Sequence, residues 1–282
     1  MTNIDEQAYL DLMKKILHEG IDSPDRTGIG TLSLFGGQLE FNLENNTLPL
    51  LTTKKMFSKG IIEELLMFLR GETDTTVLSK QGIKIWEGNT SREFLDNHGL
   101  SHLPTGSLGK GYSFQWRNFC GEDGKPGIDQ IAKIINQIKT DPYSRRIILT
   151  ALNPLQEKEM SLYPCHCVYM FYIRNNELSC HMLQRSADLF LGVGFNIASA
   201  ALLTHVIAKM TGLSAKKLII SFGDVHIYNN HIEQCKDQIK RIPFKFPTVE
   251  IPEIDMNFNV THKDFKIIGY ESHPAIKGDM AI

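Results

Sequence analysis

The sequence predicts a mixed α+β fold in which residues 1–282 form a single domain. Helical and strand-like patterns follow one another along the chain, and no internal repeat, low-complexity tract or hinge-like linker divides it. A nearly continuous apolar segment after Asn196 needs a large core around it. With 282 residues, 42% of them hydrophobic, the chain can supply such a core.

Five segments have the pattern of helices. Residues 60–70 carry a broad apolar face with Glu64 at its border and Glu63 on its far side, and a carboxylate half-sunk against a core is expected to have a raised pKa. Asp129 is placed to cap the third segment, and Gly212 ends the apolar one. In order, the expected helices are residues 5–18, 60–70, 129–139, the apolar stretch after Asn196, and a polar stretch from about 229.

Strand-like runs alternate with these helices. Apolar and polar residues alternate around Gly36-Gly37, which indicates a bent strand pair or a bulge. The Gly- and Ser-rich stretch 99–112 is expected to be an irregular loop, and the tail 243–282 is strand-like but interrupted by proline. The expected strands are residues 31–43, 145–152, 166–173, 177–190 and 218–222.

Composition narrows the class of protein. A formal net charge of −2 argues against a nucleic-acid-binding surface. Five cysteines, an odd number, and an acidic rather than basic N-terminal stretch favour free thiols in a reducing cytoplasm. No apolar run was expected to reach the roughly 18 residues that span a bilayer. The sequence therefore predicts a cytoplasmic protein with no membrane partner.

Cys165, beside His166 in the stretch Tyr-Pro-Cys-His, is the candidate nucleophile. A cysteine attacks as the thiolate, and nearby cations lower its pKa. The ordinary alternative is a buried cysteine with no chemical role. Zinc is a weaker alternative, because Cys165-His166-Cys167 has no second ligand pair at a fitting spacing. No metal is expected.

Other polar residues suggest a phosphorylated ligand. Arginine binds phosphate through two parallel hydrogen bonds, and a neighbouring serine adds a hydroxyl donor. Asn196 could cap the apolar helix, or its amide could pair with a donor and an acceptor on a base edge. His226 and Tyr228 point the same way on an extended segment and could both donate to a sugar hydroxyl. The arginines concerned are Arg26, Arg145, Arg146 and Arg185, the last followed by Ser186. Surface salt bridges remain the alternative for each arginine.

Taken together, these stretches resemble thymidylate synthase along almost the entire chain. The long central block, with PCH upstream and GD-x-HIY downstream, is highly specific. The segments that carry the resemblance are DRTGIGTLSLFG, PLLTTKK, IIEELLMFLRGET, IWEGNTSREFL, SRRIILTALNP, PCHC, ELSCHMLQRSADLFLGVGFNIASAALLTH, FGDVHIYNNHIEQ and SHPAIKGDMAI.

The resemblance implies one large mixed β-sheet packed with helices, in a symmetric dimer joined sheet to sheet. It implies methylation of dUMP at C5, with 5,10-methylenetetrahydrofolate as both carbon donor and reductant. Cys165 would add to C6 of uracil beside the cation of Arg185. Glu64 would relay protons around O4, Tyr112 would assist removal of the C5 proton, and His166 and Gln184 would belong to the hydrogen-bond network beside the nucleophile.

The resemblance also distributes the binding roles. Arg26, Arg185 and Ser186 would hold the phosphate, joined by Arg145 and Arg146 of the partner subunit. Asn196 would match N3–H and O4 of uracil, and His226 and Tyr228 would hold the 3′-hydroxyl. The folate would lie against Trp86, Asn89, Asp188, Leu191, Gly192 and Phe195, with Ala281 and Ile282 closing over it. Gln184 and Asp188 are also assigned to the nucleotide.

Several positions depart from the family pattern. The changes near Tyr112 and Phe195 would border the folate cleft, so that water rather than hydride could end the reaction and give a hydroxymethyl group. Asn196 stands where cytosine-specific relatives often carry Asp, so uracil is the expected base. Reductive methylation is the expected reaction, and hydroxymethylation of dUMP, or less so of dCMP, is the alternative. The departing residues are Phe57, Met67, Lys110, Gly111, Leu152, Gly194 and Ala200.

Overall fold

A computed structural model of the chain describes residues 3–122 and 124–280. Its centre is a six-stranded sheet in which β5 and β6 run parallel and every other neighbouring pair is antiparallel. A separate two-stranded sheet pairs β7 (Thr248–Glu250) with β8 (Lys266–Ile268). The spatial order in the large sheet is β1 (Ile21–Ser23), β2 (Thr31–Asn42), β6 (Ser214–Tyr228), β5 (Glu177–Asp188), β4 (His166–Arg174) and β3 (Ile148–Thr150).

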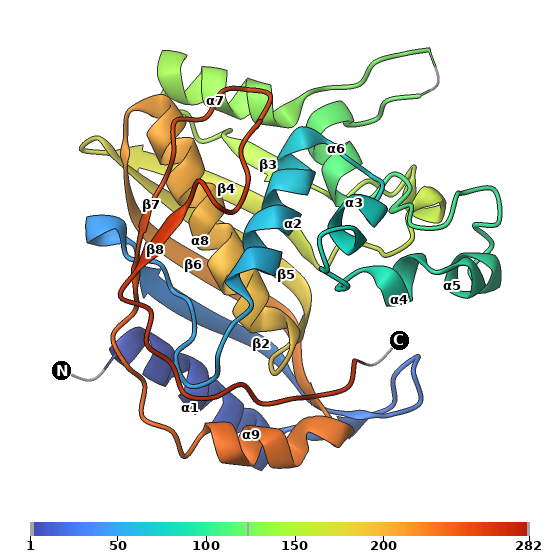
Figure 1. Cartoon of the computed structure of the whole chain (residues 1–282), viewed down its shortest axis with the longest axis vertical. Helices are drawn as coiled ribbons and strands as arrows, with labels where there is room; N and C mark the ends of the chain where they lie inside the picture. Colours follow the sequence, from blue (N-terminus) through green and yellow to red (C-terminus); the bar gives the residue numbers. More distant parts are fainter. Residues whose placement is uncertain (1–2, 123, 281–282) are drawn as a thin grey trace.

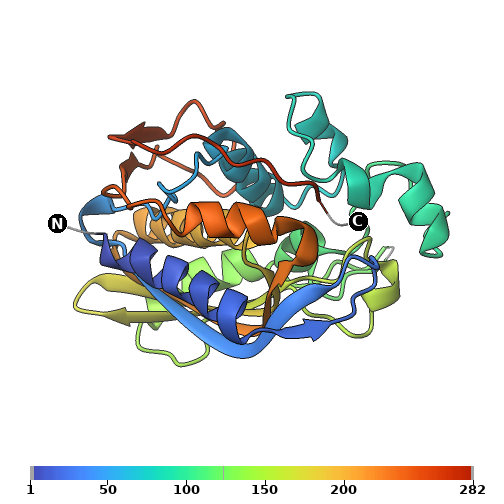
Figure 2. The same ribbon diagram turned by 90° about the horizontal axis from the view of Figure 1, so that it is seen from below.

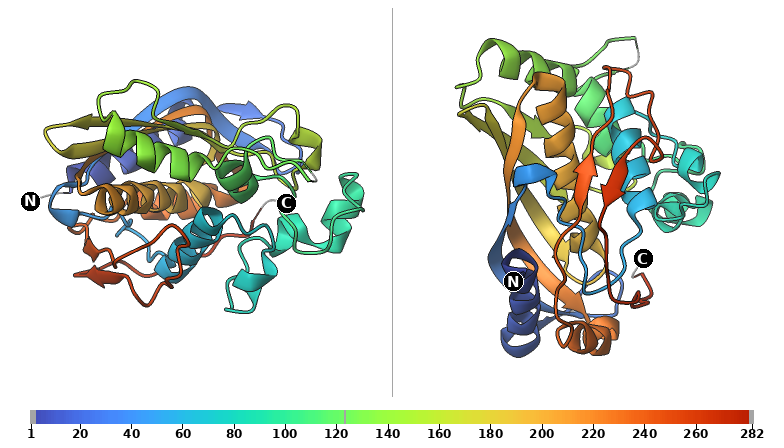
Figure 3. Two further views of the ribbon diagram at one scale, coloured as in Figure 1. Left: turned by 90° about the horizontal axis from the view of Figure 1, so that it is seen from above. Right: turned by 60° about the vertical axis from the view of Figure 1, so that its left-hand side comes forward.

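The helices lie on one face of this sheet (Figure 2). The longest, α8 (Gly192–Thr211), packs on β5 and β6 with one side and contacts α2 and α7 with the other (Figure 3). The other helices are α1 (Ile4–Glu19), α2 (Ser58–Arg70), α3 (Thr76–Ser79), α4 (Glu87–Thr90), α5 (Arg92–Asn97), α6 (Tyr112–Asn118), α7 (Gln130–Thr140) and α9 (Ile232–Gln238), with 3-10 turns at Glu44–Asn46, Glu157–Glu159 and Asn229–His231.

The opposite face of the sheet carries none of these helices (Figure 2). On strands β4 and β5 it presents Met170, Tyr172 and Leu183, which are 38%, 55% and 41% exposed. Val168 and Leu183 are direct cross-strand partners there. An apolar sheet face of this kind usually packs against something.

The mixed α+β architecture with one large sheet confirms the predicted fold class. Asp129 caps α7 as expected, accepting a hydrogen bond from Ala132 N (2.9 Å), and Gly212 ends α8 with φ +73°. Two expectations were wrong. Strand β2 runs unbroken through Gly36 in one register, without a bulge. Helix α8 begins at Gly192, so Asn196 lies inside it and cannot be its N-cap.

Helix α8 also corrects the expectation about apolar runs. Its alanines, glycines and threonines count toward a segment that is long and apolar enough to cross a membrane. In the fold, 78% of that apolar window is buried, because the sheet and the neighbouring helices cover it. The segment is therefore a core helix, and its composition follows from burial on every side.

Candidate active site

One cavity of about 480 Å³ opens where β5 and β6 end and α8 begins. Ligands commonly bind in the crevice at the carboxyl ends of parallel strands, and Asp188 and Tyr228, the last residues of β5 and β6, both line this cavity. Of the predicted site residues that the structure describes, all but two line this cavity. Those that line it are Arg26, Glu64, Trp86, Asn89, Tyr112, Cys165, His166, Gln184, Arg185, Ser186, Asp188, Leu191, Gly192, Phe195, Asn196, His226 and Tyr228.

Cys165 sits at the start of β4 in a partly exposed position. Its backbone is fixed by two hydrogen bonds, from Cys165 N to the Tyr112 hydroxyl (2.6 Å) and from Arg185 N to Cys165 O (2.9 Å). A β-bulge between His166 and Val168 follows at once. An extra residue in a strand re-aims the side chains beside it. The bulge lets His166 face the same side as Tyr169, which alternation alone would place on opposite faces.

The guanidinium of Arg185 is anchored next to the nucleophile. Its Nε donates to Pro164 O (3.0 Å) and its Nη2 donates to Tyr163 O (2.7 Å). Burial raises the pKa of the Cys165 thiol, while Arg185, Tyr112 and Arg26 act to lower it. Arg185 and Arg26 thus lower this pKa as the sequence predicted, but the net direction is upward. Burial outweighs them, and Arg185 limits the rise.

Tyr112, His166 and Phe68 form a stack beside Cys165. Ring centroids lie 4.4 Å apart for Tyr112 and His166, and 5.1 Å apart for Tyr112 and Phe68. The Tyr169 hydroxyl hydrogen-bonds His166 Nδ1 (2.8 Å). Burial lowers the pKa of His166 to about 4, so this imidazole is neutral at pH 7. Phe68 and Tyr169 were not anticipated as site residues, and only the bulge explains why Tyr169 reaches His166.

Glu64 faces the cavity from α2 and accepts a hydrogen bond from Trp86 Nε1 (2.8 Å). Burial raises the pKa of Glu64 to about 7, against a smaller lowering by Trp86. This result confirms the prediction that a carboxylate at the border of an apolar helix face has a raised pKa. A carboxyl group with a pKa near 7 can both give and take a proton under physiological conditions.

Gln184 and Asn196 form an amide pair on the cavity floor. Gln184 Nε2 donates to Asn196 Oδ1 (3.0 Å) and to Ser186 O (3.0 Å). This contact fixes the Asn196 amide with its Nδ2 donors free to point at a ligand acceptor, while Oδ1 keeps a second lone pair for a ligand donor. Asn196 can therefore match a paired donor and acceptor on a base edge.

His226 and Tyr228 lie together on β6 with ring centroids 5.3 Å apart. His226 Nδ1 is 2.7 Å from Asp224 Oδ1. A neutral imidazole that donates through Nδ1 offers Nε2 as an acceptor, so His226 would receive a hydroxyl proton where Tyr228 can donate one. In this tautomer His226 accepts where Tyr228 donates, whereas the sequence predicted that both would donate to the hydroxyl.

Arg26 lies exposed on the loop between β1 and β2. The carboxylate of Asp25 holds this loop by accepting from Thr27 N (2.9 Å), Thr27 Oγ1 (2.6 Å) and Gly30 N (2.8 Å). The Thr27 hydroxyl is the largest of the contacts that lower the pKa of Asp25 to about 2. Arg26 shares the cavity edge with Arg185 and Ser186, as a phosphate site requires.

The remaining wall is apolar and extends to the last described residues. Trp86, Leu191 and Phe195 provide it, together with Ile85, Leu162, Gly278 and Met280, which the sequence did not single out. The C-terminal segment is tied down by a hydrogen bond between His231 Nε2 and Asp279 O (2.8 Å). A Cβ on Gly278 would come within 2.7 Å of Phe190 Cε1, so only glycine allows this close passage.

Two predicted site residues, among those that the structure describes, are not brought into this cavity. Arg145 and Arg146 are exposed on the segment that precedes β3, and neither lines it. Ala281, with Ile282, lies outside the described residues. The asparagine and aspartate assigned to the folate do line it, and Asp188 also accepts from Phe190 N (3.0 Å) and Leu191 N (3.1 Å), which orders the start of α8.

The departures from the family pattern lie outside the lining of the cavity. None of the seven lines the cavity. A Cβ on Gly194 would come within 2.8 Å of Leu51 Cδ1 and 3.1 Å of Met56 Cε, so these side chains fill its space. Lys110 pairs with Glu159 (2.8 Å). At Gly194, neighbouring side chains therefore occupy the space that a larger residue would take.

Within residues 3–122 and 124–280, no group of three or more His, Cys, Asp or Glu side chains is placed to hold a metal ion. Cys120, Cys165, Cys167, Cys180 and Cys235 are all free thiols.

Comparison with known proteins agrees with the site. The model of the thymidylate synthase family matches residues 7–282. Thymidylate synthase of Candida albicans is 48% identical over 99% of this chain and 98% of its own length. That of Saccharomyces cerevisiae is also 48% identical, over 99% of this chain and 98% of its own. The bifunctional dihydrofolate reductase-thymidylate synthase of Paramecium tetraurelia is 48% identical over 98% of this chain, which spans 61% of that longer relative.

Proposed function

This chain belongs to the thymidylate synthase family, and from that membership and the cavity we propose that it methylates dUMP at C5 to give dTMP and dihydrofolate. The observation that carries the proposal is that one cavity collects the nucleophile, an ionisable carboxyl group, an amide that can match uracil and a pair of arginines. Relatives named thymidylate synthase give the same answer, so a hydroxymethylase is not favoured.

Cys165 adds through Sγ to C6 of uracil, which places negative charge on C5 and O4. The Arg185 guanidinium, held by Pro164 O and Tyr163 O, stabilises the thiolate that attacks. Glu64, with its pKa near 7, exchanges a proton at O4 without a large energetic cost. Tyr112, whose hydroxyl accepts a hydrogen bond from Cys165 N, assists loss of the C5 proton.

The nucleotide is oriented by the two rims of the cavity. Asn196 donates to O4 and accepts from N3–H, with Gln184 holding its amide in place. His226 and Tyr228 bind the 3′-hydroxyl from β6. Arg26, Arg185 and Ser186 bind the phosphate at the outer edge.

The apolar wall fits a folate. Methylenetetrahydrofolate supplies the one-carbon unit and the hydride when it is bound. Trp86, Leu191 and Phe195 would contact its rings, with Asn89 and Asp188 as polar neighbours. Gly278 and Met280 close the same wall and exclude water.

We further propose a homodimer joined through the bare face of the sheet. The exposed Met170, Tyr172 and Leu183 would be buried in it. Arg145 and Arg146, which lie outside the cavity of their own chain, would reach the phosphate bound by the partner. The free thiols fit the reducing cytoplasm that we propose as its location.

The direct test supplies dUMP and methylenetetrahydrofolate and follows dihydrofolate by absorbance, with the mass of the nucleotide measured in parallel. Stoichiometric dihydrofolate and a nucleotide heavier by CH2 are expected. A product heavier by CH2O, formed without dihydrofolate, would identify the hydroxymethylase instead. No product from dUMP or dCMP would overturn both.

Mixed dimers test the shared site. Cys165→Ala and Arg146→Ala subunits should each be weak alone. After unfolding and refolding together, the hybrid dimer contains one site with both intact residues, and about a quarter of wild-type activity should return. If mixing restores nothing, Arg146 does not serve the partner's site.

A further inference from the structure

Helix α2 presents two different stripes to its surroundings. Glu64 and Phe68, four residues apart, share the stripe that faces the cavity, where Glu64 meets Trp86 and Phe68 stacks on Tyr112. Glu63 and Arg70, seven residues apart, share a neighbouring stripe that faces away from the cavity. The rotation of this one helix therefore sets where Glu64 points.

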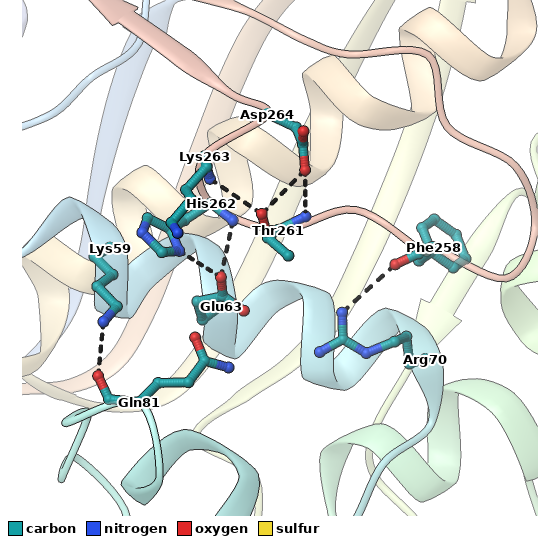
Figure 4. Close-up of polar contacts among 9 residues, drawn as sticks. All are labelled: Lys59, Glu63, Arg70, Gln81, Phe258, Thr261, His262, Lys263 and Asp264. Carbon is teal, nitrogen blue, oxygen red and sulfur yellow. Dashed lines mark hydrogen bonds and ion pairs between the residues drawn. The ribbon is translucent and has the colours of Figure 1, made fainter.

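The second stripe is covered by residues 256–264, which we call the α2 strap (Figure 4). His262 N and His262 Nδ1 lie 2.8 and 2.6 Å from the same oxygen of Glu63, Oε1. Near the other end of the helix, Arg70 Nη1 donates to Phe258 O (3.5 Å). The sequence placed Glu63 on the polar side of the helix, but the strap leaves its side chain only 2% exposed.

A buried carboxylate without partners is costly, so the helix has one rotation that satisfies Glu63. The other charged groups near this contact are occupied elsewhere. Lys59 Nζ donates to Gln81 O (2.6 Å), and Asp264 accepts from Thr261 N (2.8 Å) and Thr261 Oγ1 (3.0 Å). Lys263 points its backbone N–H at Thr261 and contributes no charge contact to Glu63. Glu63 is thus held by His262 alone among the described side chains.

We propose that His262 and Glu63 act as positioning residues, which fix the rotation of α2 so that Glu64 meets Trp86 and the cavity. The inference rests on the proposed function for its kinetic consequence. The fixed rotation of α2, which is the geometric part of the inference, does not depend on the proposed function. The chain that follows the strap leads into the cavity wall at Gly278 and Met280. Two hydrogen bonds hold it on the way: the Tyr270 hydroxyl donates to Leu51 O (2.7 Å), and the backbone N–H of His273 donates to Thr52 O (2.8 Å).

The test compares Glu63→Ala with Glu63→Gln. The glutamine keeps an oxygen that can accept from both His262 groups and removes only the charge, whereas alanine removes both bonds. Trp86 reports the protonation of its partner Glu64, and Trp116→Phe removes the only other tryptophan of the chain. In that background, Trp86 fluorescence is titrated from pH 4 to 9. Glu64→Gln is the control that assigns the transition.

We expect a midpoint near pH 7 in the parent and in Glu63→Gln, and a midpoint about one unit lower in Glu63→Ala, because a loosened helix admits water to Glu64. In the wild-type background, kcat should fall about tenfold in Glu63→Ala with KM for dUMP unchanged, and Glu63→Gln should restore it. His262→Ala, which keeps the backbone bond, should give a smaller change in the same direction.

An unchanged midpoint and kcat in folded Glu63→Ala would overturn the proposal and leave the contact a purely structural one. If that variant fails to fold, His262→Ala decides by the same two readouts. The fluorescence titration needs no turnover. A wild-type chain that makes no dTMP therefore refutes the proposed function, while the positioning of Glu64 is still decided by the midpoint.

Discussion

The two ends of the cavity hold their polar groups in opposite ways. At the base end, burial is the largest influence on the pKa of Glu64, His166 and Cys165, and each favours its neutral form. At the phosphate end, Arg26 and Arg185 are exposed and stay charged. The base end is therefore suited to moving protons, and the phosphate end to holding a permanent anion. Substitutions should separate the two ends by their effects on kcat and on KM.

The largest effect is expected for Cys165→Ala at the base end. This change removes the only thiol among the described residues that line the cavity and should reduce turnover to background. Nucleotide binding should survive, because the arginines and Asn196 are untouched. Single-turnover assays and calorimetry with dUMP measure the two quantities. Appreciable turnover in this variant would refute the role of the thiol.

Glu64→Gln should lower kcat by about 10²- to 10³-fold, since general acid–base catalysis contributes about that much. The raised pKa of Glu64 can also be tested without substrate, through the direction in which the unfolding free energy changes with pH. The folded chain keeps a proton on Glu64 up to about pH 7, whereas the unfolded chain releases it near 4.5. The unfolding free energy should therefore decrease as the pH rises between these values, by up to about 3 kcal/mol.

Urea unfolding at pH 5 and pH 8 measures this difference. The wild type should lose more stability than Glu64→Gln over the interval. An equal loss in both proteins would mean that Glu64 is not the buried acid that the geometry indicates.

Asn196→Asp is expected to change which base is recognised rather than the reaction at C5. An ionised carboxylate offers only acceptors, so it cannot donate to O4 of uracil as the amide held by Gln184 can, but it can accept from the N4 amine of cytosine; preference should therefore shift from dUMP toward dCMP by about 10- to 100-fold. The ratio of kcat/KM for the two nucleotides measures it. An unchanged ratio would exclude Asn196 from base recognition.

The smallest effect is expected at the phosphate end, for Asp25→Asn. The asparagine amide keeps one oxygen that can accept from the loop that carries Arg26. It lacks the negative charge that the hydrogen bonds from Thr27 and Gly30 stabilise. KM for dUMP should rise by a few fold, about 1 kcal/mol or less, with kcat unchanged. A fall in kcat comparable to that of Glu64→Gln would erase the distinction between the two ends.

Much of this site could be predicted because residue types and helix periodicity carry it. Glu64 could be placed at a helix border from spacing alone, and the pairing of His226 with Tyr228 follows from an extended strand. The bulge after His166 could not be predicted, because the local alternation of side chains gives no sign of an extra residue. Burial of Glu63 depends on a partner 199 positions away, which no local pattern contains.

The same limit applies to the charge at the nucleophile. The sequence places arginines near Cys165 but does not measure how deeply the thiol lies, and the competition between desolvation and attraction is decided by depth. Arg145 and Arg146 are a second example of what the sequence alone does not predict. Their absence from the cavity of their own chain is a fact of the fold that composition does not contain.

The path of the C-terminal segment has a consequence for the synthesis of the protein. The cavity wall contains Arg26, near residue 1 of this sequence, and Met280, which is translated much later. A ribosome shields the most recent part of a nascent chain, so the sheet and α8 can fold before this wall exists. We therefore expect the growing chain to expose Cys165 without a closed folate site, and the pocket to be completed only once residues 278–280 have left the ribosome.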